Sequence, residues 1–317
     1  MKKVLRFVAL SMALVMIFCL AASCSKKKKT YKIGIIQQLE HEALDAATQG
    51  FKDALTDLLG DAVEFDYQNA ANDPTNCATI CTKFVNDKVD LIMANATTAL
   101  QSAAQATDTI PIVGTSITDY VSAGVADSNE KPGGNVTGAS DLAPIDQQID
   151  LLFTLVPDAK TVGIIYCSSE ANSIYQADLA KECLESKGAT VNIYTVADSN
   201  EIQAVATKAV GEIDALYIPT DNTMADNMEI IKNLTIPAKL PVICGEENMC
   251  LGGGLATLSI SYYDLGYTAG KMAYRILVDG EDPATMSIEY GGVTLKYNKE
   301  IADAIGIDIP DNMLPIE

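Results

Sequence analysis

The pattern of hydrophobic and polar positions changes period repeatedly once the chain has passed residue 30. Residues 33–36 are apolar without interruption, as expected for a strand that is buried on both faces. Phe51, Leu55 and Leu59 then recur at the spacing of one helical face. Strands of this kind that alternate with helices predict an α/β fold built on doubly wound parallel sheets.

This succession of strand and helix occurs twice along the chain. Three pairs of segments match in the same order at offsets of 124 to 130 residues, and a fourth pair matches more weakly. We therefore expect two similar lobes, with a small-molecule site in the cleft where the carboxyl ends of their strands face each other. The matching pairs are 31–55 with 161–184, 89–104 with 213–228, 110–120 with 240–250, and the weaker 133–140 with 252–259.

The first residues have the order of a secretory signal. Lys2, Lys3 and Arg6 precede the apolar run 7–20, and small residues then lead to Cys24. The run has 14 residues, whereas a helix needs about 20 to span a bilayer. This stretch resembles the lipobox of bacterial lipoproteins, although an ordinary secreted protein with a chance cysteine is the alternative.

The lipoprotein interpretation predicts where the chain resides. Residues 1–23 would be removed, and Cys24 would become the lipidated first residue of the mature protein. Two acyl chains give stable anchoring, and the lysine-rich tether 24–29 would lie near anionic headgroups. We therefore expect a protein anchored in the cell membrane that faces away from the cytoplasm.

Charge and composition exclude several classes of partner and cofactor. The formal net charge is −20, and removal of the three positive signal residues would bring it to −23. Such a surface repels nucleic acid. The remaining cysteines and the single histidine, His41, form no zinc-binding pattern, so we expect no metal and no cofactor. Buried thiols are favoured, and a disulfide stays possible in an exported protein, for Cys77, Cys81, Cys167, Cys183, Cys244 and Cys250.

Motifs of common enzyme classes are missing from the sequence. It contains no phosphate-binding G-x-x-x-x-G-K-[ST], no G-x-G-x-x-G after a strand, and no G-x-S-x-G. His41 stands beside Glu42, but no nucleophile or metal ligand accompanies them. Binding without catalysis is therefore the favoured interpretation.

Five short motifs carry a resemblance to a known family. The chain resembles the substrate-binding lipoproteins of ABC importers, in particular the family that includes proteins binding tryptophan and other aromatic amino acids. This resemblance implies the type I periplasmic-binding-protein fold, with two lobes and a three-strand hinge. The motifs are HEALD at 41–45, GNVTG at 134–138, SSEANS at 168–173, IPTDNT at 218–223 and YDLGYTAGKM at 263–272.

The resemblance also implies how the chain is divided between the lobes. Lobe one would comprise residues 30–141 and 256–289, and lobe two would comprise residues 142–255 and 290–317. The three hinge strands would lie at 140–143, 256–258 and 290–293. Closure of the lobes around a ligand is the expected motion.

The polar turns at the strand ends supply the candidate ligand contacts, and helix capping is the alternative role for each. Free N–H groups and hydroxyls at Thr97 and Thr98 favour a carboxylate, and Asp221 is the expected partner of an ammonium group. The remaining candidates lie in the matching turns of both lobes. They are Gln37, His41, Glu42, Thr115, Ser116, Ser169, Glu170, Asn172, Ser173, Asn222 and Glu246.

These observations predict a monomeric receptor that delivers one small molecule to an ABC permease and its ATPase. An L-amino acid is the expected ligand, aromatic before aliphatic. A nucleoside or sugar ligand is an alternative, and so is a sensor of the same fold that presents its ligand-bound form to a signalling partner.

Overall fold

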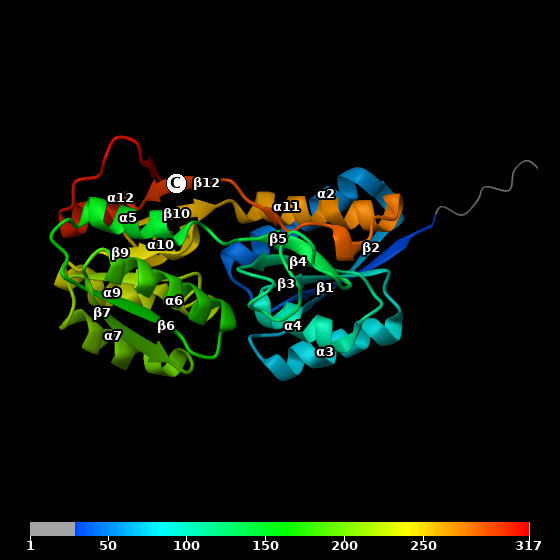
Figure 1. Ribbon diagram of the computed structural model, residues 1–317, viewed down its shortest axis with the longest axis horizontal. Coiled ribbons are helices and arrows are strands. Elements are labelled where there is room, and N and C mark those ends of the chain that lie inside the picture. Colours follow the sequence, from blue (N-terminus) through cyan, green and yellow to red (C-terminus); the bar gives the residue numbers. More distant parts are fainter. Residues whose placement is uncertain (1–28, 317) are drawn as a thin grey trace, which may run out of the picture.

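Two parallel sheets organise the chain into two lobes that lie side by side (Figure 1). The computed structural model describes residues 29–316. The predicted signal segment and Cys24 therefore lie outside the described residues. Within residues 29–316, no helix is both long and apolar enough to cross a membrane.

The sheet of lobe one has the strand order β11-β5-β4-β3-β1-β2. Strand β1 lies between β2 and β3, so Ile33 faces Phe65 on one side and Leu91 on the other. This central position explains why the strand is continuously apolar. The strands are β1 Tyr31–Gln37, β2 Val63–Asn69, β3 Leu91–Asn95, β4 Ile112–Ile117, β5 Val136–Ser140 and β11 Glu289–Tyr290.

The sheet of lobe two has the order β13-β12-β10-β9-β8-β6-β7. Its succession β7-β6-β8-β9-β10 reproduces the succession β2-β1-β3-β4-β5 of lobe one, as the sequence repeats predict. Among the strand pairs of the described residues, only the pair of β10 and β12 is antiparallel, and β13 follows the direction of β12. The strands are β6 Thr161–Cys167, β7 Thr190–Val196, β8 Ala215–Ile218, β9 Val242–Cys244, β10 Ala256–Ile260, β12 Val293–Tyr297 and β13 Leu314–Pro315.

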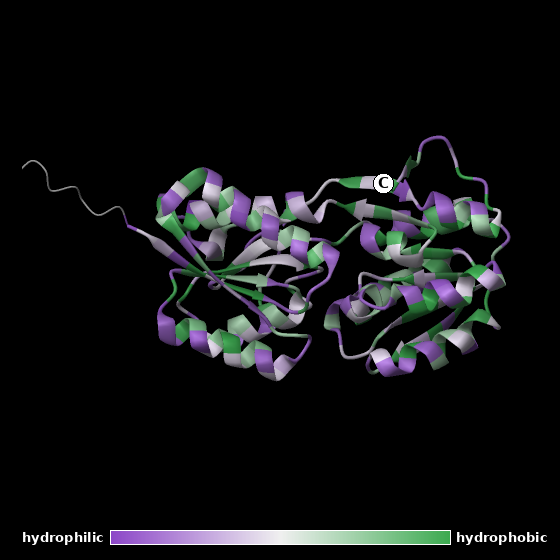
Figure 2. Ribbon diagram, turned by 180° about the vertical axis from the view of Figure 1, so that it is seen from behind, coloured by the Kyte–Doolittle hydropathy of each residue, from purple (hydrophilic) through white to green (hydrophobic). Residues whose placement is uncertain are grey.

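Helices cover both faces of each sheet with their apolar sides. In Figure 2 the strands carry much of the hydrophobic colour, whereas the helices alternate between hydrophobic and hydrophilic residues. In lobe one, α2 packs with α11, and α3 packs with α4. The lobe-one helices are α2 Glu42–Leu59, α3 Pro74–Asp87, α4 Thr97–Ala106 and α11 Tyr262–Tyr274. The lobe-two helices are α5 Ile145–Leu155, α6 Ala171–Ser186, α7 Ile202–Val210, α8 Asn222–Ala225, α9 Met228–Ala238, α10 Glu247–Gly253 and α12 Lys299–Ile305.

Helices α2 and α11 approach each other closely because glycines lie at their crossing. A Cβ atom added at Gly266 would stand 1.9 Å from the carbonyl oxygen of Ala47. A Cβ at Gly50 would stand 2.1 Å from the carbonyl oxygen of Tyr263. Any side chain at these positions would therefore push the two helices apart.

The chain passes between the lobes three times. The crossings lie between β5 and α5, between β10 and α11 at Ser261, and between β11 and β12 at Gly291 and Gly292. Strand β10 pairs with β9 and β12, so residues 256–260 belong to the sheet of lobe two. The expectation that lobe one resumes at residue 256 is therefore wrong by one strand. The sequence shows that residues 256–260 form a strand, but the strands with which it pairs are known only from the folded sheet. The crossing was therefore placed before this strand and not after it.

The cysteines of the described residues are free thiols, and all but Cys183 are buried. Burial raises the pKa of Cys77 to about 11 and that of Cys81 to about 12. Both thiols therefore stay protonated and unreactive at neutral pH.

Candidate ligand-binding site

A narrow cavity lies between the two lobes, where the carboxyl ends of their strands meet. Its empty space, with the open mouth included, is about 310 Å³, and hardly any of it is wide enough for a water molecule. An amino acid is much wider than a water molecule, so side chains or whole lobes must move to admit one. The lining residues are His41, Leu44, Ser116, Thr118, Asp141, Asn172, Thr220, Asp221, Asn222, Ala225, Glu246, Met249 and Tyr262.

Direct hydrogen bonds join the lobes around this cavity. Nε2 of Gln176 in lobe two donates to Oγ1 of Thr118 in lobe one over 3.0 Å. Nε2 of His41 lies 3.3 Å from Oδ1 of Asn222, on opposite sides of the cleft. The lobes are therefore closed on each other in this structure.

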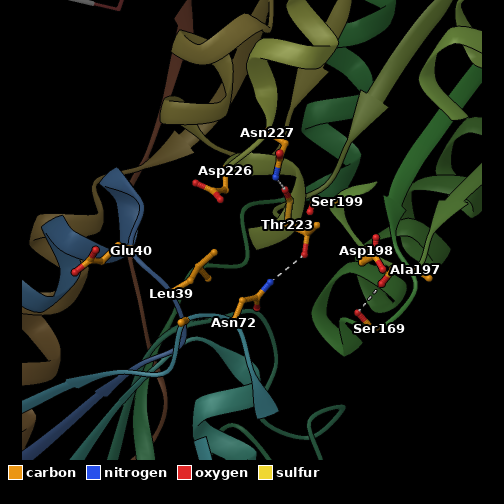
Figure 3. Close-up of a pocket in the computed structure, with 11 residues that line it drawn as sticks. Leu39, Glu40, Asn72, Ser169, Ala197, Asp198, Ser199, Thr223, Asp226 and Asn227 are labelled. Atoms are coloured by element: carbon orange, nitrogen blue, oxygen red, sulfur yellow. Dashed lines mark hydrogen bonds between the residues drawn. The ribbon is translucent and has the colours of Figure 1, made fainter. Parts of the chain in front are cut away.

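A wider cleft lies beside the cavity, lined by residues that adjoin the cavity residues in sequence, such as Glu40 and Thr223 (Figure 3). Asn72 of lobe one reaches across it, and its Nδ2 donates to Oγ1 of Thr223 over 3.4 Å. Glu40, Asp198 and Asp226 make its walls acidic. A cationic group would be drawn to this entrance.

Asp141 occupies the first crossing between the lobes. Its carboxylate accepts hydrogen bonds from the hydroxyls of Tyr262, over 2.9 Å, and Thr118, over 3.3 Å. Burial raises the pKa of Asp141 to about 6. The sequence interpretation did not include Asp141, Thr118, Thr220 or Tyr262 among the candidate contacts. For Asp141, the only signal in the sequence was its position as an acidic residue directly after a strand, at an expected hinge.

Asp221 and Glu170 hold the start of α8 in place. Asp221 accepts from the backbone N–H of Cys167 over 2.6 Å and from that of Met224 over 2.8 Å. Glu170 accepts from the backbone N–H groups of Asn222, over 3.0 Å, and Thr223, over 2.9 Å. Burial, followed by the nearby Glu170 carboxylate, raises the pKa of Asp221. Both carboxylates thus already have partners within lobe two, which is the capping role weighed against ligand contact.

Glu246 caps α10 and also lines the cavity. Its carboxylate accepts from the backbone N–H of Asn248 over 2.7 Å and from that of Met249 over 2.5 Å. Burial raises the pKa of Glu246 to about 7, against the opposing effect of these two hydrogen bonds.

The cavity is acidic, and none of its described lining residues is a lysine or an arginine. Asp141, Asp221 and Glu246 contribute three carboxyl groups. Burial lowers the pKa of His41, which favours the neutral imidazole. The arrangement therefore suits a ligand that brings a positive charge with it.

Two polar atoms in the cavity wall have no hydrogen-bond partner. They are Oγ of Ser116 and Nδ1 of His41, and both are buried. Ser116 also has a φ of 57°, a left-handed conformation that is uncommon for a residue with a Cβ. Unpaired polar groups and backbone strain gather at binding sites because a ligand supplies the missing partner.

The other predicted contacts are distributed unevenly. Asn172 and Asn222 line the cavity, and Ser169 lines the wider cleft. Gln37 instead bonds within lobe one, where its amide accepts from Thr48 over 2.6 Å and donates to Asp45 over 2.6 Å. The candidates that line neither the cavity nor the wider cleft are Gln37, Glu42, Thr97, Thr98, Thr115, Glu170 and Ser173.

Residues 32–316 match the sequence model of a family described as "ABC transporter substrate binding protein". The chain belongs to this family. It is therefore a binding protein rather than an enzyme, and it works with an ABC transporter. Substrate-binding proteins of this kind act outside the cytoplasm.

A curated relative of this substrate-binding protein is named for its ligand. It is the "Tyrosine-binding protein" of Clostridioides difficile (strain R20291), which is 43% identical over 256 residues, covering 80% of this chain and 74% of the relative. An "ABC domain in complex with L-Trp" from "Streptococcus pneumonia" superposes with a TM-score of 0.86 at 35% identity. That alignment covers 89% of this chain and 97% of the other.

A third relative distinguishes open from closed arrangements. The "ligand-free, open structure" of a substrate-binding protein from Clostridium difficile is 39% identical to this chain, with a TM-score of 0.72. The alignment covers 91% of this chain and 99% of the other. The open protein is thus more similar in sequence than the L-Trp complex but superposes less well. This substrate-binding protein therefore has the closed arrangement of lobes. A leucine-binding protein from Thermotoga maritima, at 14% identity and a TM-score of 0.64, shares the type I periplasmic-binding-protein fold.

Proposed function

We infer that this protein is a lipid-anchored receptor of an ABC importer and that it binds an L-amino acid with an aromatic side chain. Two of its relatives support this ligand class, one named for tyrosine and one solved with L-Trp. The acidic cavity between the lobes supports a ligand with an ammonium group. Anchoring through Cys24 rests on the sequence of the first thirty residues.

Asp141 carries the proposal, because it is the cavity carboxyl group whose side-chain hydrogen bonds come from hydroxyls and not from N–H groups at the start of a helix. Asp221 and Glu246 each cap a short helix and accept two backbone N–H groups. Asp141 has two hydroxyl partners among its side-chain contacts. A buried carboxylate of this kind gains most from a cation, so the ammonium group is assigned to Asp141 in place of Asp221.

The rest of the ligand would meet complementary surfaces in the same cavity. The unpartnered hydroxyl of Ser116 is the proposed donor to the ligand carboxylate. Leu44, Met249 and the ring of Tyr262 provide the apolar wall against which an aromatic side chain would pack. The proposed carboxylate site therefore moves from Thr97 and Thr98 to the next turn of lobe one.

The test is a calorimetric and thermal-shift panel on the protein without its signal and tether. L-Tyr, L-Trp and L-Phe should bind, and L-Leu, the D-isomers, nucleosides and sugars should bind far more weakly or not at all. At a hundred times its dissociation constant, a ligand stabilises the fold by about 2.7 kcal/mol, which shifts the unfolding temperature by about 5 °C or more. Binding of a nucleoside or sugar alone would refute the proposed ligand class.

Asp141→Asn separates the ammonium assignment from a general loss of fold. The variant removes the proposed charge partner while keeping a side chain of the same shape. Affinity for the amino acid should fall by roughly 3 kcal/mol, about a hundredfold. The ligand-free variant should unfold at pH 7 no more easily than the parent, because a buried charge has been removed. Unchanged affinity in Asp141→Asn would exclude this residue as the ammonium partner.

A further inference from the structure

Helix α2 begins at the cleft without a cap from its own lobe. His41 occupies the N-cap position and its side chain makes no capping hydrogen bond. The imidazole instead faces Asn222 of lobe two. The N–H groups in the first turn of a helix lack intrahelical acceptors, so α2 needs a partner from outside for the N–H of Ala43.

Asn248 of lobe two supplies that partner. We assign the amide of Asn248 the orientation, with oxygen and nitrogen exchanged, that matches its neighbours: Oδ1 then accepts from the N–H of Ala43 over 3.3 Å, and Nδ2 donates to Oε2 of Glu42 over 3.3 Å. Asn248 therefore contacts two polar groups at the start of α2, the N–H of Ala43 and the carboxylate of Glu42. It does not line the ligand cavity.

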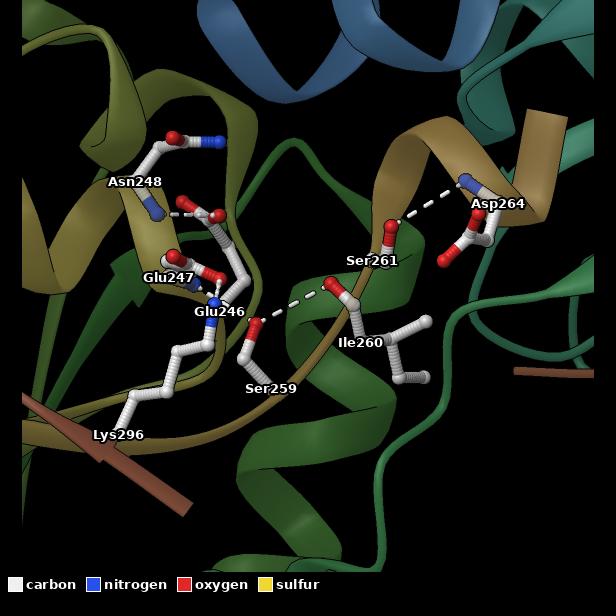
Figure 4. Close-up of polar contacts among 8 residues, drawn as sticks. All are labelled: Glu246, Glu247, Asn248, Ser259, Ile260, Ser261, Asp264 and Lys296. Atoms are coloured by element: carbon white, nitrogen blue, oxygen red, sulfur yellow. Dashed lines mark hydrogen bonds and ion pairs between the residues drawn. The ribbon is translucent and has the colours of Figure 1, made fainter. Parts of the chain in front are cut away.

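The segment that carries Asn248 is fixed to lobe two by several polar contacts (Figure 4). The backbone N–H of Asn248 donates to Glu246, and that of Glu247 donates to Oγ of Ser259 on β10 over 3.0 Å. The carboxylate of Glu247 pairs with Nζ of Lys296 on β12 over 2.6 Å. Strands β10 and β12 both adjoin crossings between the lobes, so Asn248 follows the position of lobe two as a rigid body.

We propose that Asn248 is a positioning residue that caps α2 from the opposite lobe and thereby favours the closed arrangement. Opening of the cleft separates the amide from Ala43 and Glu42, while closure restores both hydrogen bonds. The residue thus acts on the equilibrium between open and closed lobes rather than on ligand contacts, and it raises the apparent affinity by raising the closed fraction. The proposal rests on the closed lobes and is independent of which ligand the cavity accepts.

An asparagine suits this position better than an aspartate for a specific reason. Its amide can donate to the Glu42 carboxylate and accept from the Ala43 N–H at the same time. An aspartate would still accept from Ala43 but would place a second negative charge against Glu42. The substitution Asn248→Asp should therefore open the cleft, and the additional substitution Glu42→Gln should close it again.

Disulfide formation between the lobes measures this equilibrium without any ligand. Asn72→Cys and Thr223→Cys replace two side chains that touch across the cleft entrance. The rate at which this pair oxidises reports how often the lobes close, while the native thiols that are buried, Cys77 and Cys81 among them, react slowly. In this background, Asn248→Asp should slow the oxidation about fivefold, as expected for a hydrogen-bond contribution of ordinary size.

The second substitution and a matched control decide the outcome. Adding Glu42→Gln to Asn248→Asp should restore most of the oxidation rate. Asn312→Asp adds the same charge at an exposed position of lobe two and should leave the rate unchanged. An unaltered rate in Asn248→Asp, or a failure of Glu42→Gln to restore it, would overturn the capping role. If the rates follow this pattern but no amino acid binds in the ligand panel, the proposed ligand class is wrong and the capping role of Asn248 stands.

Discussion

Three buried carboxyl groups determine how the cavity responds to pH. Burial raises the pKa values of Asp141 to about 6 and Glu246 to about 7, and it raises that of Asp221 as well. In the unfolded chain such groups ionise near pH 4. The folded protein therefore holds more protons than the unfolded chain between about pH 4 and pH 7.

The sign of the resulting pH dependence follows directly. Stability falls with rising pH wherever the folded state binds more protons, so these groups make the ligand-free protein less stable at pH 7 than at pH 5. His41, whose pKa burial lowers, opposes this trend as one group against three, and carboxylates with lowered pKa values, such as Asp66 and Asp214, oppose it only below about pH 4. Thermal unfolding of the ligand-free protein should thus show a higher midpoint at pH 5 than at pH 7. Asp141→Asn should flatten that difference, and an equal slope in the variant would show that Asp141 ionises normally.

The sequence predicted the turns of the site better than the individual contacts. Strand ends could be located from apolar runs, and His41, Ser116 and Asn222 were named in this way. Asp221 was assigned a ligand role because sequence cannot tell whether a carboxylate is already bound by backbone N–H groups. Asp141 was missed because it becomes part of the cavity only when a crossing brings it between the lobes.

At the scale of elements, the pairing of α2 with α11 fixes the geometry of lobe one. These helices are distant in sequence, but glycines allow their backbones to touch. The periodicity of α2 could be read from the sequence, whereas its partnership with α11 could not. The misplacement of β10 has a similar cause, because a strand is assigned to a sheet by its neighbours and not by its own residues.

Gly266→Ala tests the close approach of these two helices. The new methyl group would meet the carbonyl oxygen of Ala47, so the helices must separate or bend. We expect a loss of about 2 to 3 kcal/mol in the free energy of unfolding, measured in urea. Gly134→Ala is the matched control, since a Cβ there has no atom within 4 Å. Equal effects of the two substitutions would show that the crossing tolerates a side chain.

At the scale of the whole molecule, access to the cavity depends on movement of the lobes. The cavity has little space wide enough for even a water molecule, and the contacts that close it come from both lobes. The two-lobe plan followed from the sequence repeats. The closed arrangement did not, because it depends on contacts between residues that are far apart in the sequence.

A disulfide that locks the cleft should therefore exclude the ligand. Asn72→Cys with Thr223→Cys, oxidised before ligand is added, should take up the amino acid at least a hundredfold more slowly than the reduced protein. Reduction should restore rapid binding, which distinguishes blocked access from damage to the site. Stopped-flow measurements on both forms give the two rates. Equal uptake by the oxidised form would show that the ligand reaches the cavity without opening of the lobes.

The three crossings also set the order in which the protein can fold as it is made. Helix α11 packs on α2 although the two helices are far apart in the sequence. Tyr263 of α11, for example, bonds to Asp53 of α2, which lies 210 residues earlier. Strand β11, which comes later still in the chain, completes the sheet of lobe one. The core of lobe one therefore stays incomplete until nearly the whole chain has emerged. The central strands of lobe two likewise form one continuous stretch from α5 to β10, but its sheet is completed only by β12 and β13 near the end of the chain. Each lobe can therefore begin to fold from its own continuous stretch, and neither is finished until its late segments have crossed back to it.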